Sequence, residues 1–102
     1  MQIQFDNPEL EKIYQQIDRG KSKYSDEVKK HFIKTILRLM IADDLVEIRS
    51  LRGLNFEALK GDFKGKYSVR VNIKYRIILR IEKDKILVED ITVIEDLTNH
   101  YK

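Results

Sequence analysis

The sequence contains no cysteine in its 102 residues. This absence excludes disulfide bonds, cysteine nucleophiles and zinc sites with thiolate ligands. The sequence also lacks an apolar run of signal-peptide length near its start, and it has no stretch of about 18 uncharged apolar residues, the length that a membrane-spanning helix needs. We therefore expect a soluble protein that works in the cytoplasm and does not enter a membrane.

The motifs of several common enzyme sites are missing as well. There is no glycine-rich phosphate loop, no HExxH zinc motif and no nucleophile elbow. Four acids near the end of the chain resemble a metal cluster only superficially, because their alternation along a strand and the lack of a nearby histidine pair favour a solvated strand edge. We expect no cofactor and no metal ion. These acids are Glu89, Asp90, Glu95 and Asp96.

Length limits the organisation of the chain. With 42% apolar and 36% charged residues, the sequence has the composition of one compact domain over residues 1–102, and a second domain does not fit. A domain of this size has little material for a deep pocket. Any chemistry is therefore expected on a surface or in a shallow cleft.

Positive charge is concentrated in one part of the sequence. Residues 49–80 hold nine Lys and Arg against two acids, a local balance of +7, so the rest of the chain carries −4 in a total of +3. This segregation predicts a basic strip on an otherwise acidic body, and phosphate groups are its most probable ligand class. The alternative is that exposed strands carry Lys and Arg only to remain soluble.

The first half of the sequence has helical periodicity. Asn7 and Pro8 predict the start of a first helix, whose apolar residues continue to Ile17 and which ends at Gly20. Ser25 predicts the cap of a longer helix that runs to about Ala42. We expect its core-facing stripe to contain Val28, Phe32, Ile33, Ile36, Leu37, Met40 and Ile41.

The second half has the period of two that is typical of strands. A first short strand is expected at residues 1–5, and further strands at 56–59, 67–74, 75–81 and 86–94, with a turn at 61–65. The predicted fold class is α+β, with two N-terminal helices packed on a curled, mainly antiparallel sheet. Ile73 should then face the helices with Val69, while Ser68, Arg70 and Lys74 lie on the open face.

The basic strip could support cleavage of an RNA phosphodiester without a metal ion. In that reaction the 2′-hydroxyl attacks the neighbouring phosphate, so the protein must move two protons and stabilise charge on the phosphoryl oxygens. Arg70 and Arg76 supply planar donors for that charge, and Lys60 supplies a point charge that could also move a proton. His100 and Tyr101 are further candidates for acid or base. Residues expected to contact RNA are Arg52, Lys64, Lys66, Lys74 and Arg80.

Structural roles remain as alternatives for these residues. Arg76 could pair with Glu89 or Glu95, and Tyr67 and Tyr75 could serve only to pack the sheet.

Residues 52–79, "RGLNFEALKGDFKGKYSVRVNIKYRIIL", resemble the host-inhibition toxins of the HigB type, within the RelE/ParE superfamily of toxin–antitoxin systems. The similar pieces are the "LKGD" turn, the "YSVRVN" strand and the following "YRI". The resemblance implies a toxin without a metal ion that enters the decoding site of the ribosome and cleaves messenger RNA. It also implies control by a cognate HigA-type antitoxin, with operator DNA bound only through that antitoxin.

Carried over residue by residue, the resemblance gives Lys60, Arg70 and Arg76 the roles of the family's lysine, phosphate-binding arginine and strand-opening arginine. The chain departs from the family pattern at Glu57, where a histidine is common, and in its ending "TNHYK". Glu57 would repel phosphate unless it serves as a base. Two alternatives stay open, namely a non-enzymatic poison of a host protein such as gyrase, as in the ParE branch, and a degenerate toxin that acts only in the antitoxin complex.

Overall fold

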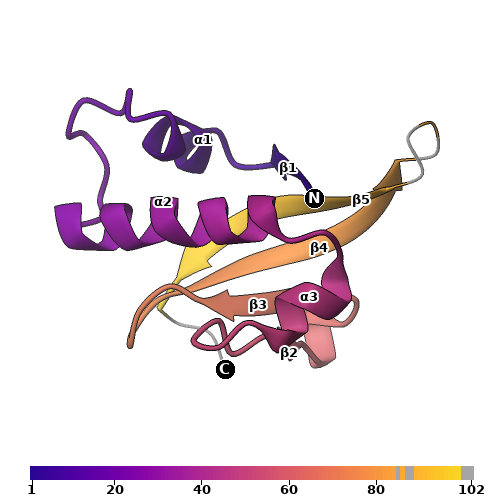
Figure 1. Cartoon of the computed structure of the whole chain (residues 1–102). Coiled ribbons are helices and arrows are strands. Elements are labelled where there is room, and N and C mark those ends of the chain that lie inside the picture. Colours follow the sequence, from indigo (N-terminus) through magenta and orange to yellow (C-terminus); the bar gives the residue numbers. More distant parts are fainter. Residues whose placement is uncertain (85, 87–88, 100–102) are drawn as a thin grey trace.

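The computed structural model describes residues 1–84, 86 and 89–99, in which helices cover one face of a five-stranded sheet (Figure 1). The strand order is β1-β5-β4-β3-β2, and these neighbours are antiparallel except for the parallel pair of β1 and β5. This architecture confirms the predicted α+β class. The elements are β1 (Gln2–Phe5), α1 (Pro8–Tyr14), α2 (Asp26–Ile41), α3 (Leu45–Ser50), β2 (Glu57–Ala58), the 3₁₀ helix η1 (Gly61–Phe63), β3 (Tyr67–Arg70), β4 (Arg76–Asp84) and β5 (Glu89–Thr98).

The first two helices begin where their caps were predicted. The side chain of Asn7 accepts hydrogen bonds from the amides of Glu9 and Leu10, and Pro8 occupies the first turn of α1. Ser25 accepts a hydrogen bond from the amide of Val28 at 3.2 Å and so caps α2. Both caps satisfy amides that have no partner within the helix.

The end of α1 was predicted wrongly. The helix stops at Tyr14, and Gln16 adopts a left-handed conformation with φ of 61°. The amide of Ile17 then donates to the carbonyl of Lys12, which closes a Schellman motif without a glycine. Because this stop carries no glycine signal, the apolar spacing falsely extended the helix to Gly20, and Ile17 is 56% exposed.

The buried face of α2 also differs from the predicted stripe. Residues four apart shift by about 40° around a helix at each step, so a row that begins at Val28 has left the core by Met40. Leu39 is fully buried in its place. The predicted core residues Leu37, Met40 and Ile41 lie at the surface.

A third helix, α3, was not predicted. It is only six residues long, and the side chain of Asp44 caps it by accepting a hydrogen bond from the amide of Glu47 at 2.9 Å. Its one fully buried residue is Ile48. One buried position in six leaves too little periodicity to be recognised from the sequence.

The strand β3 is half as long as predicted. It ends at Arg70, and the side-chain oxygen of Asn72 accepts hydrogen bonds from the amides of Lys74 and Tyr75. This local turn replaces the strand-to-strand hydrogen bonds that the apolar–polar alternation of the sequence predicted. The prediction that Ile73 faces the helices is therefore wrong, since 84% of its surface is exposed at the turn.

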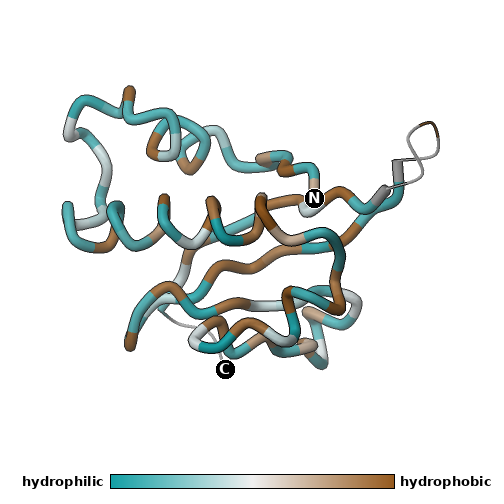
Figure 2. Tube along the Cα trace, viewed as in Figure 1, coloured by the Kyte–Doolittle hydropathy of each residue, from teal (hydrophilic) through white to brown (hydrophobic). Residues whose placement is uncertain are grey.

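The main core lies between α2 and the sheet. It includes Phe32 and Ile36 of α2 and Val69, Ile77 and Leu79 of β3 and β4, and Figure 2 shows brown, hydrophobic segments along the inner strands. Burial of this apolar surface is the main force that holds the layers together.

The other sheet face is less open than predicted. Ser68, Ile78 and Val93 are buried there, outside the main core, although Ser68 was expected to be open. Segment 59–66 folds back towards this face, and the ion pair of Lys66 at its end with Glu95 on β5 holds it there. Arg70 and Arg76 remain half-buried at the border of the covered area.

Candidate functional site

The candidate site centres on two arginines on neighbouring strands. Arg70 is the last residue of β3 and Arg76 the first of β4, and the two are direct partners in the antiparallel register. Opposite residues in such a pair have Cα atoms about 5 Å apart and side chains on the same face. Because Val69 and Ile77 point into the main core, both arginines lie on the sheet face away from the helices.

Arg76 is held by several neighbouring groups. Its Nε donates to the hydroxyl of Ser68 at 2.8 Å, and its Nη2 donates to the backbone carbonyl of Asn55. The side chain is 19% exposed, whereas Ser68 is completely buried. The guanidinium is therefore fixed in orientation before any ligand arrives.

Glu57 lies beside Arg76. The carboxylate Oε2 of Glu57 is 3.7 Å from Nη2 of Arg76, and Glu57 pairs with Ser68 across β2 and β3. At 56% exposure, this carboxylate remains open to solvent. Glu57 is thus an acid that faces Arg76, while the carboxylate of Glu95, an alternative from the sequence, binds Lys66 and Arg80.

Arg70 and Lys60 present further positive charge. Nε of Arg70 donates to the backbone carbonyl of Asn72 at 3.3 Å, and Arg70 forms no ion pair within the described part of the chain. Lys60 is exposed and precedes the 3₁₀ helix η1, three residues after Glu57. The "LKGD" segment therefore follows β2 directly, and Gly61 completes its turn with φ of 63°.

The remaining cations of the basic strip divide into two groups. Lys66 and Arg80 bind the carboxylate of Glu95 at 2.6 and 2.8 Å, and Arg80 also binds Asp6 and Glu82. The hydrogen bonds to these three acids raise the pKa of Arg80. Exposed cations that form no ion pair with described residues are Arg49, which lies over the ring of Phe56, and Arg52, Lys64 and Lys74.

Glu95 is charged although it is partly buried. Burial alone would raise its pKa, but the hydrogen bonds from Lys66 and Arg80 outweigh that effect and hold the pKa below the usual range of a glutamate. The residue sits where the register of β4 and β5 shifts, between the pairs Leu79–Ile94 and Ile78–Asp96. This bulge directs an acid towards the loop that carries Lys60.

His100 and Tyr101, the predicted acid or base residues at the end of the chain, lie outside the described residues. The described part of β5 ends with Thr98, which is the register partner of Arg76.

Clefts of about 470 and 680 Å³ flank the turn between β3 and β4. Both are lined by Lys23, Tyr75 and Asn99. Tyr75 packs edge-on against Tyr24, whose hydroxyl donates to the carbonyl of Leu97 at 2.8 Å. Burial, with a smaller effect of nearby Asp96, raises the pKa of Tyr24 to about 12, so Tyr24 is neutral at physiological pH.

The described residues contain no group of three His, Asp or Glu side chains that could hold a metal ion. In residues 1–84, 86 and 89–99, no helix has the length and apolar character needed to cross a membrane.

Sequence reasoning missed three residues that organise the site. Ser68 and Asn55 orient Arg76, and Glu95 anchors Lys66. Asn55 offered a weak signal, because asparagine is one of the few residues that readily adopt positive φ, and its φ is 44°. The contacts of Ser68 and Glu95 depend on strand pairing and a bulge, which single-strand alternation does not reveal.

The side chains of Arg70, Arg76 and Glu57 can together bind a phosphate group and accept a proton. Two guanidinium groups on one face can bind a phosphate group through charge-assisted hydrogen bonds. The exposed carboxylate of Glu57 beside them can accept a proton from a bound hydroxyl group.

Comparisons with known proteins fit this fold. A family model described as RelE-like toxin of type II toxin–antitoxin system HigB matches residues 3–92. The structure is similar to the YoeB/ParE toxin from Agrobacterium tumefaciens, with 19% identity, a TM-score of 0.60 and coverage of 99% of this chain and 100% of that chain. It is also similar to a YoeB-YefM complex from Staphylococcus aureus, with 23% identity, a TM-score of 0.59 and coverage of 99% and 98%. At these identities the likeness shows the fold alone, and a comparison with curated proteins gave no match.

Proposed function

Because this chain belongs to the HigB-like family of RelE-like toxins from type II toxin–antitoxin systems, we propose that it is a toxin that cleaves messenger RNA in the decoding site of the ribosome. The observation that carries this proposal is the pair Arg70 and Arg76 on one sheet face, with the carboxylate of Glu57 3.7 Å from Arg76. Phosphate binding and proton removal are two of the requirements of RNA cleavage without a metal ion, and protonation of the departing oxygen is the third.

The first chemical step is attack by the 2′-hydroxyl on the adjacent phosphorus. Glu57 accepts the hydroxyl proton as the O2′–P bond forms, because an exposed carboxylate beside a phosphate-binding arginine lies where that hydroxyl would approach. The P–O5′ bond then breaks. The products are a 2′,3′-cyclic phosphate on one fragment and a 5′-hydroxyl on the other.

The arginines stabilise the charge that develops on the non-bridging phosphoryl oxygens. The hydrogen bonds of Arg76 to Ser68 and Asn55 leave its guanidinium little freedom, so no reorganisation is needed when the charge builds up. Arg70 adds a second planar donor from β3.

The departing 5′-oxygen needs a proton. Lys60, on the exposed turn after β2, is one candidate donor. His100 and Tyr101 are the others, because they follow a strand end, Thr98, that is paired with Arg76. One of these three residues donates the proton to the 5′-oxygen.

The ribosome supplies the orientation that this open site lacks. A surface with two arginines and one carboxylate does not by itself align a flexible message for in-line attack, whereas a message held in the decoding site is already positioned. The exposed cations Arg52, Lys64 and Lys74 are proposed to contact RNA, as are Lys66 and Arg80 after partial release from Glu95. Regulation would come from a cognate HigA-type antitoxin, and operator DNA would be bound through that antitoxin.

Primer extension on a defined message, translated in a purified system, tests the proposed function. We expect new 3′ ends that appear only during translation and that disappear with Arg70→Ala. Arg19→Ala is the matched control, because Arg19 is exposed in the loop between α1 and α2, away from β3 and β4. Cleavage that persists in Arg70→Ala would contradict the assigned site.

An intact message would reject the nuclease function altogether. Plasmid supercoiling would then separate the two alternatives. Altered topology would indicate a gyrase poison, and unaltered topology in cells that grow normally would indicate a degenerate toxin.

A further inference from the structure

One side of α2 exposes a continuous row of apolar residues. Leu37, Met40 and Ile41 are 44%, 39% and 78% exposed, and Ile33 beside them is half-buried. Ile33, Leu37 and Ile41 follow at intervals of four, with Met40 on the neighbouring row, so they lie along one side of the helix. We call these four residues the α2 stripe. Single exposed apolar residues are ordinary, but a contiguous row often marks an interaction site.

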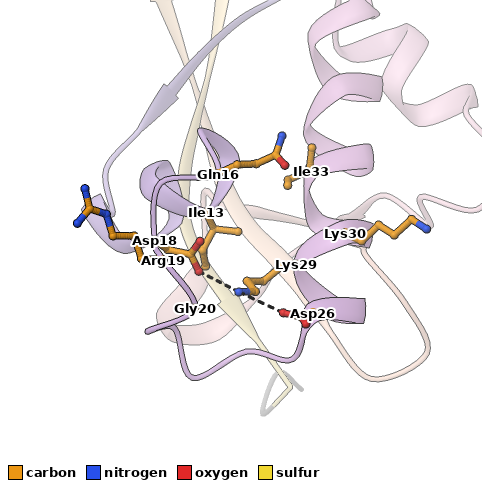
Figure 3. Close-up of a pocket in the computed structure, with 9 residues that line it drawn as sticks. All are labelled: Ile13, Gln16, Asp18, Arg19, Gly20, Asp26, Lys29, Lys30 and Ile33. Carbon is orange, nitrogen blue, oxygen red and sulfur yellow. Dashed lines mark hydrogen bonds and ion pairs between the residues drawn. The ribbon is translucent and has the colours of Figure 1, made fainter.

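The α2 stripe continues into a cleft of about 480 Å³ between α1 and α2. In Figure 3, Ile13 and Gln16 from the end of α1 and the turn after it lie across the cleft from Ile33 on α2. Further along, the hydroxyl of Tyr14 lies 3.8 Å from the sulfur of Met40. The end of α1 therefore forms one wall of a groove along α2, in which the apolar residues Ile13 and Ile33 lie beside charged residues of the loop and of the start of α2.

Positive charge borders this groove. Lys30 and Lys34 are exposed on the outer side of α2 and form no ion pair with the described residues. The nearby acids Asp18 and Asp26 are already bound to Lys29, at 3.0 and 3.4 Å (Figure 3). The groove thus combines the exposed apolar side chains of the α2 stripe with lysines that form no ion pair with the described residues.

These properties fit an amphipathic helix with acidic residues beside its apolar side. Such a helix buries residues spaced by three or four positions in a groove, and its acids can pair with Lys30 and Lys34. A second copy of this chain fits poorly, because a two-fold contact through the same surface would bring these lysines together. The apolar side chains of the α2 stripe also do not suit contact with a charged nucleic-acid backbone.

We propose that the α2 stripe and its bordering lysines are the docking surface for an acidic amphipathic helix of the cognate antitoxin. This inference rests on the chain being a toxin with an antitoxin partner, and not on its cleaving RNA. Because the α2 stripe points away from the sheet, a helix bound there leaves Arg70 and Arg76 on the far face uncovered.

Affinity for the purified product of the neighbouring antitoxin gene tests the docking surface. The double variant Leu37→Glu/Ile41→Glu should bind the antitoxin about 100-fold more weakly or worse, because two apolar anchors would be replaced by charges. Lys34→Glu should weaken binding by about 10-fold through charge repulsion. Calorimetric titration measures these changes, and circular dichroism checks that each variant is folded.

Ile73→Glu is the matched control, because Ile73 is the exposed apolar residue of the turn beside Arg70 and Arg76. Its antitoxin affinity should stay within about 3-fold of the unmodified protein. If Ile73→Glu weakens binding and the double variant does not, the antitoxin covers the arginine face and the inference is overturned.

Methyl NMR of the unmodified protein gives a test without mutations. On addition of the antitoxin, the methyl signals of Ile33, Leu37 and Ile41 should shift, while that of Ile73 should stay in place. The opposite pattern would reject the docking surface.

The primer-extension assay keeps this inference separate from the proposed function. The double variant should still cleave the message and should no longer be inhibited by the antitoxin. If the unmodified protein does not cleave but the double variant loses antitoxin affinity, the nuclease function fails and the docking surface stands. If cleavage occurs and the double variant is fully inhibited, the docking surface fails alone.

Discussion

Among the described residues, groups from three parts of the chain contact the guanidinium of Arg76. Ser68 comes from β3, Glu57 from β2, and the carbonyl of Asn55 from the segment before β2. Each contact limits a different rotation of the side chain. Such fixed orientation is what a residue needs in order to stabilise charge that exists only in a transition state.

Glu57→Gln should remove the proposed proton acceptor with almost no change in shape. We expect the rate of message cleavage under single-turnover conditions to fall by about 100-fold or more. The free energy of unfolding should change by less than about 0.5 kcal/mol, because the carboxylate is 56% exposed. Rapid-quench kinetics on translating ribosomes measure the rate.

Glu11→Gln on α1 is the control for Glu57→Gln, because Glu11 is also exposed and lies in the helical layer. Cleavage by Glu57→Gln within about 3-fold of the unmodified rate would exclude Glu57 as the base.

Ser68→Ala should affect both stability and cleavage. The change leaves Nε of Arg76 without its acceptor in a place where Ser68 is completely buried, so we expect a loss of about 1–2 kcal/mol in the free energy of unfolding. Cleavage should also slow, because Arg76 loses orientation. Urea unfolding measures the first effect, and Ser50→Ala at an exposed site should show neither. Unchanged stability of Ser68→Ala would mean that water replaces the hydroxyl.

At the scale of elements, the bulge in β5 links the sheet to the loop that carries Lys60. The bulge presents Glu95 to Lys66 at the end of segment 59–66. The amide of Leu59 donates a hydrogen bond to the carbonyl of Lys66 and so closes the backbone loop of this segment. Asn7, before α1, also donates to the carbonyl of Glu95. One residue thus ties together β5, the "LKGD" loop and the start of the helical layer.

Glu95→Gln should reduce stability in a way that depends on pH. The pKa of Glu95 in the folded protein lies below the value of about 4.3 expected for an unfolded glutamate. Its ion pairs therefore stabilise the fold above that pH, and the stabilisation is lost as the pH falls through the folded-state pKa. We expect the variant to be about 1–2 kcal/mol less stable at neutral pH.

Urea unfolding of both proteins as a function of pH measures this difference. It should shrink towards zero as the pH falls through the folded-state pKa of Glu95, because below that pKa the residue is protonated in both states. A difference that stays constant down to that pH would show that packing, and not charge, explains the effect.

The caps of α1 and α2 and the period of the strands could be read from the sequence, because each depends on a few neighbouring residues. The early stop of α1 at Tyr14, the helix α3 and the turn at Asn72 could not. The stop of α1 depends on the left-handed conformation of Gln16, which is not a glycine, and α3 depends on one buried residue, Ile48. The turn depends on the side chain of Asn72, which binds backbone amides in place of a neighbouring strand. Local patterns do not resolve such competition.

At the scale of the whole molecule, the protein has two different surfaces. The far face of the sheet carries Arg70, Arg76 and Glu57, and the helical layer carries the α2 stripe with Lys30 and Lys34. Contact with RNA and contact with an antitoxin helix can thus use separate surfaces. The size of the bound antitoxin would then prevent the toxin from entering the ribosome, while the face that carries Arg70 and Arg76 stays uncovered.

The sequence indicated the cations of the site but not their arrangement. Segregated charge and the family resemblance pointed to Lys60, Arg70 and Arg76, and the register of β3 and β4 brings the two arginines together. That Lys66 and Arg80 are bound to Glu95 could not be foreseen, because it depends on the bulge in β5. Charge counts alone therefore overestimate the free positive surface.

Cleavage of the message by its own 2′-hydroxyl is tested most directly by single-turnover reactions on programmed ribosomes. The short message carries either ribose or 2′-deoxyribose at the nucleotide to be cut. We predict that the ribose message is cleaved to a 2′,3′-cyclic phosphate and a 5′-hydroxyl, and that the deoxy message stays intact because the nucleophile is missing. Equal cleavage of both messages, or of neither, would contradict this prediction.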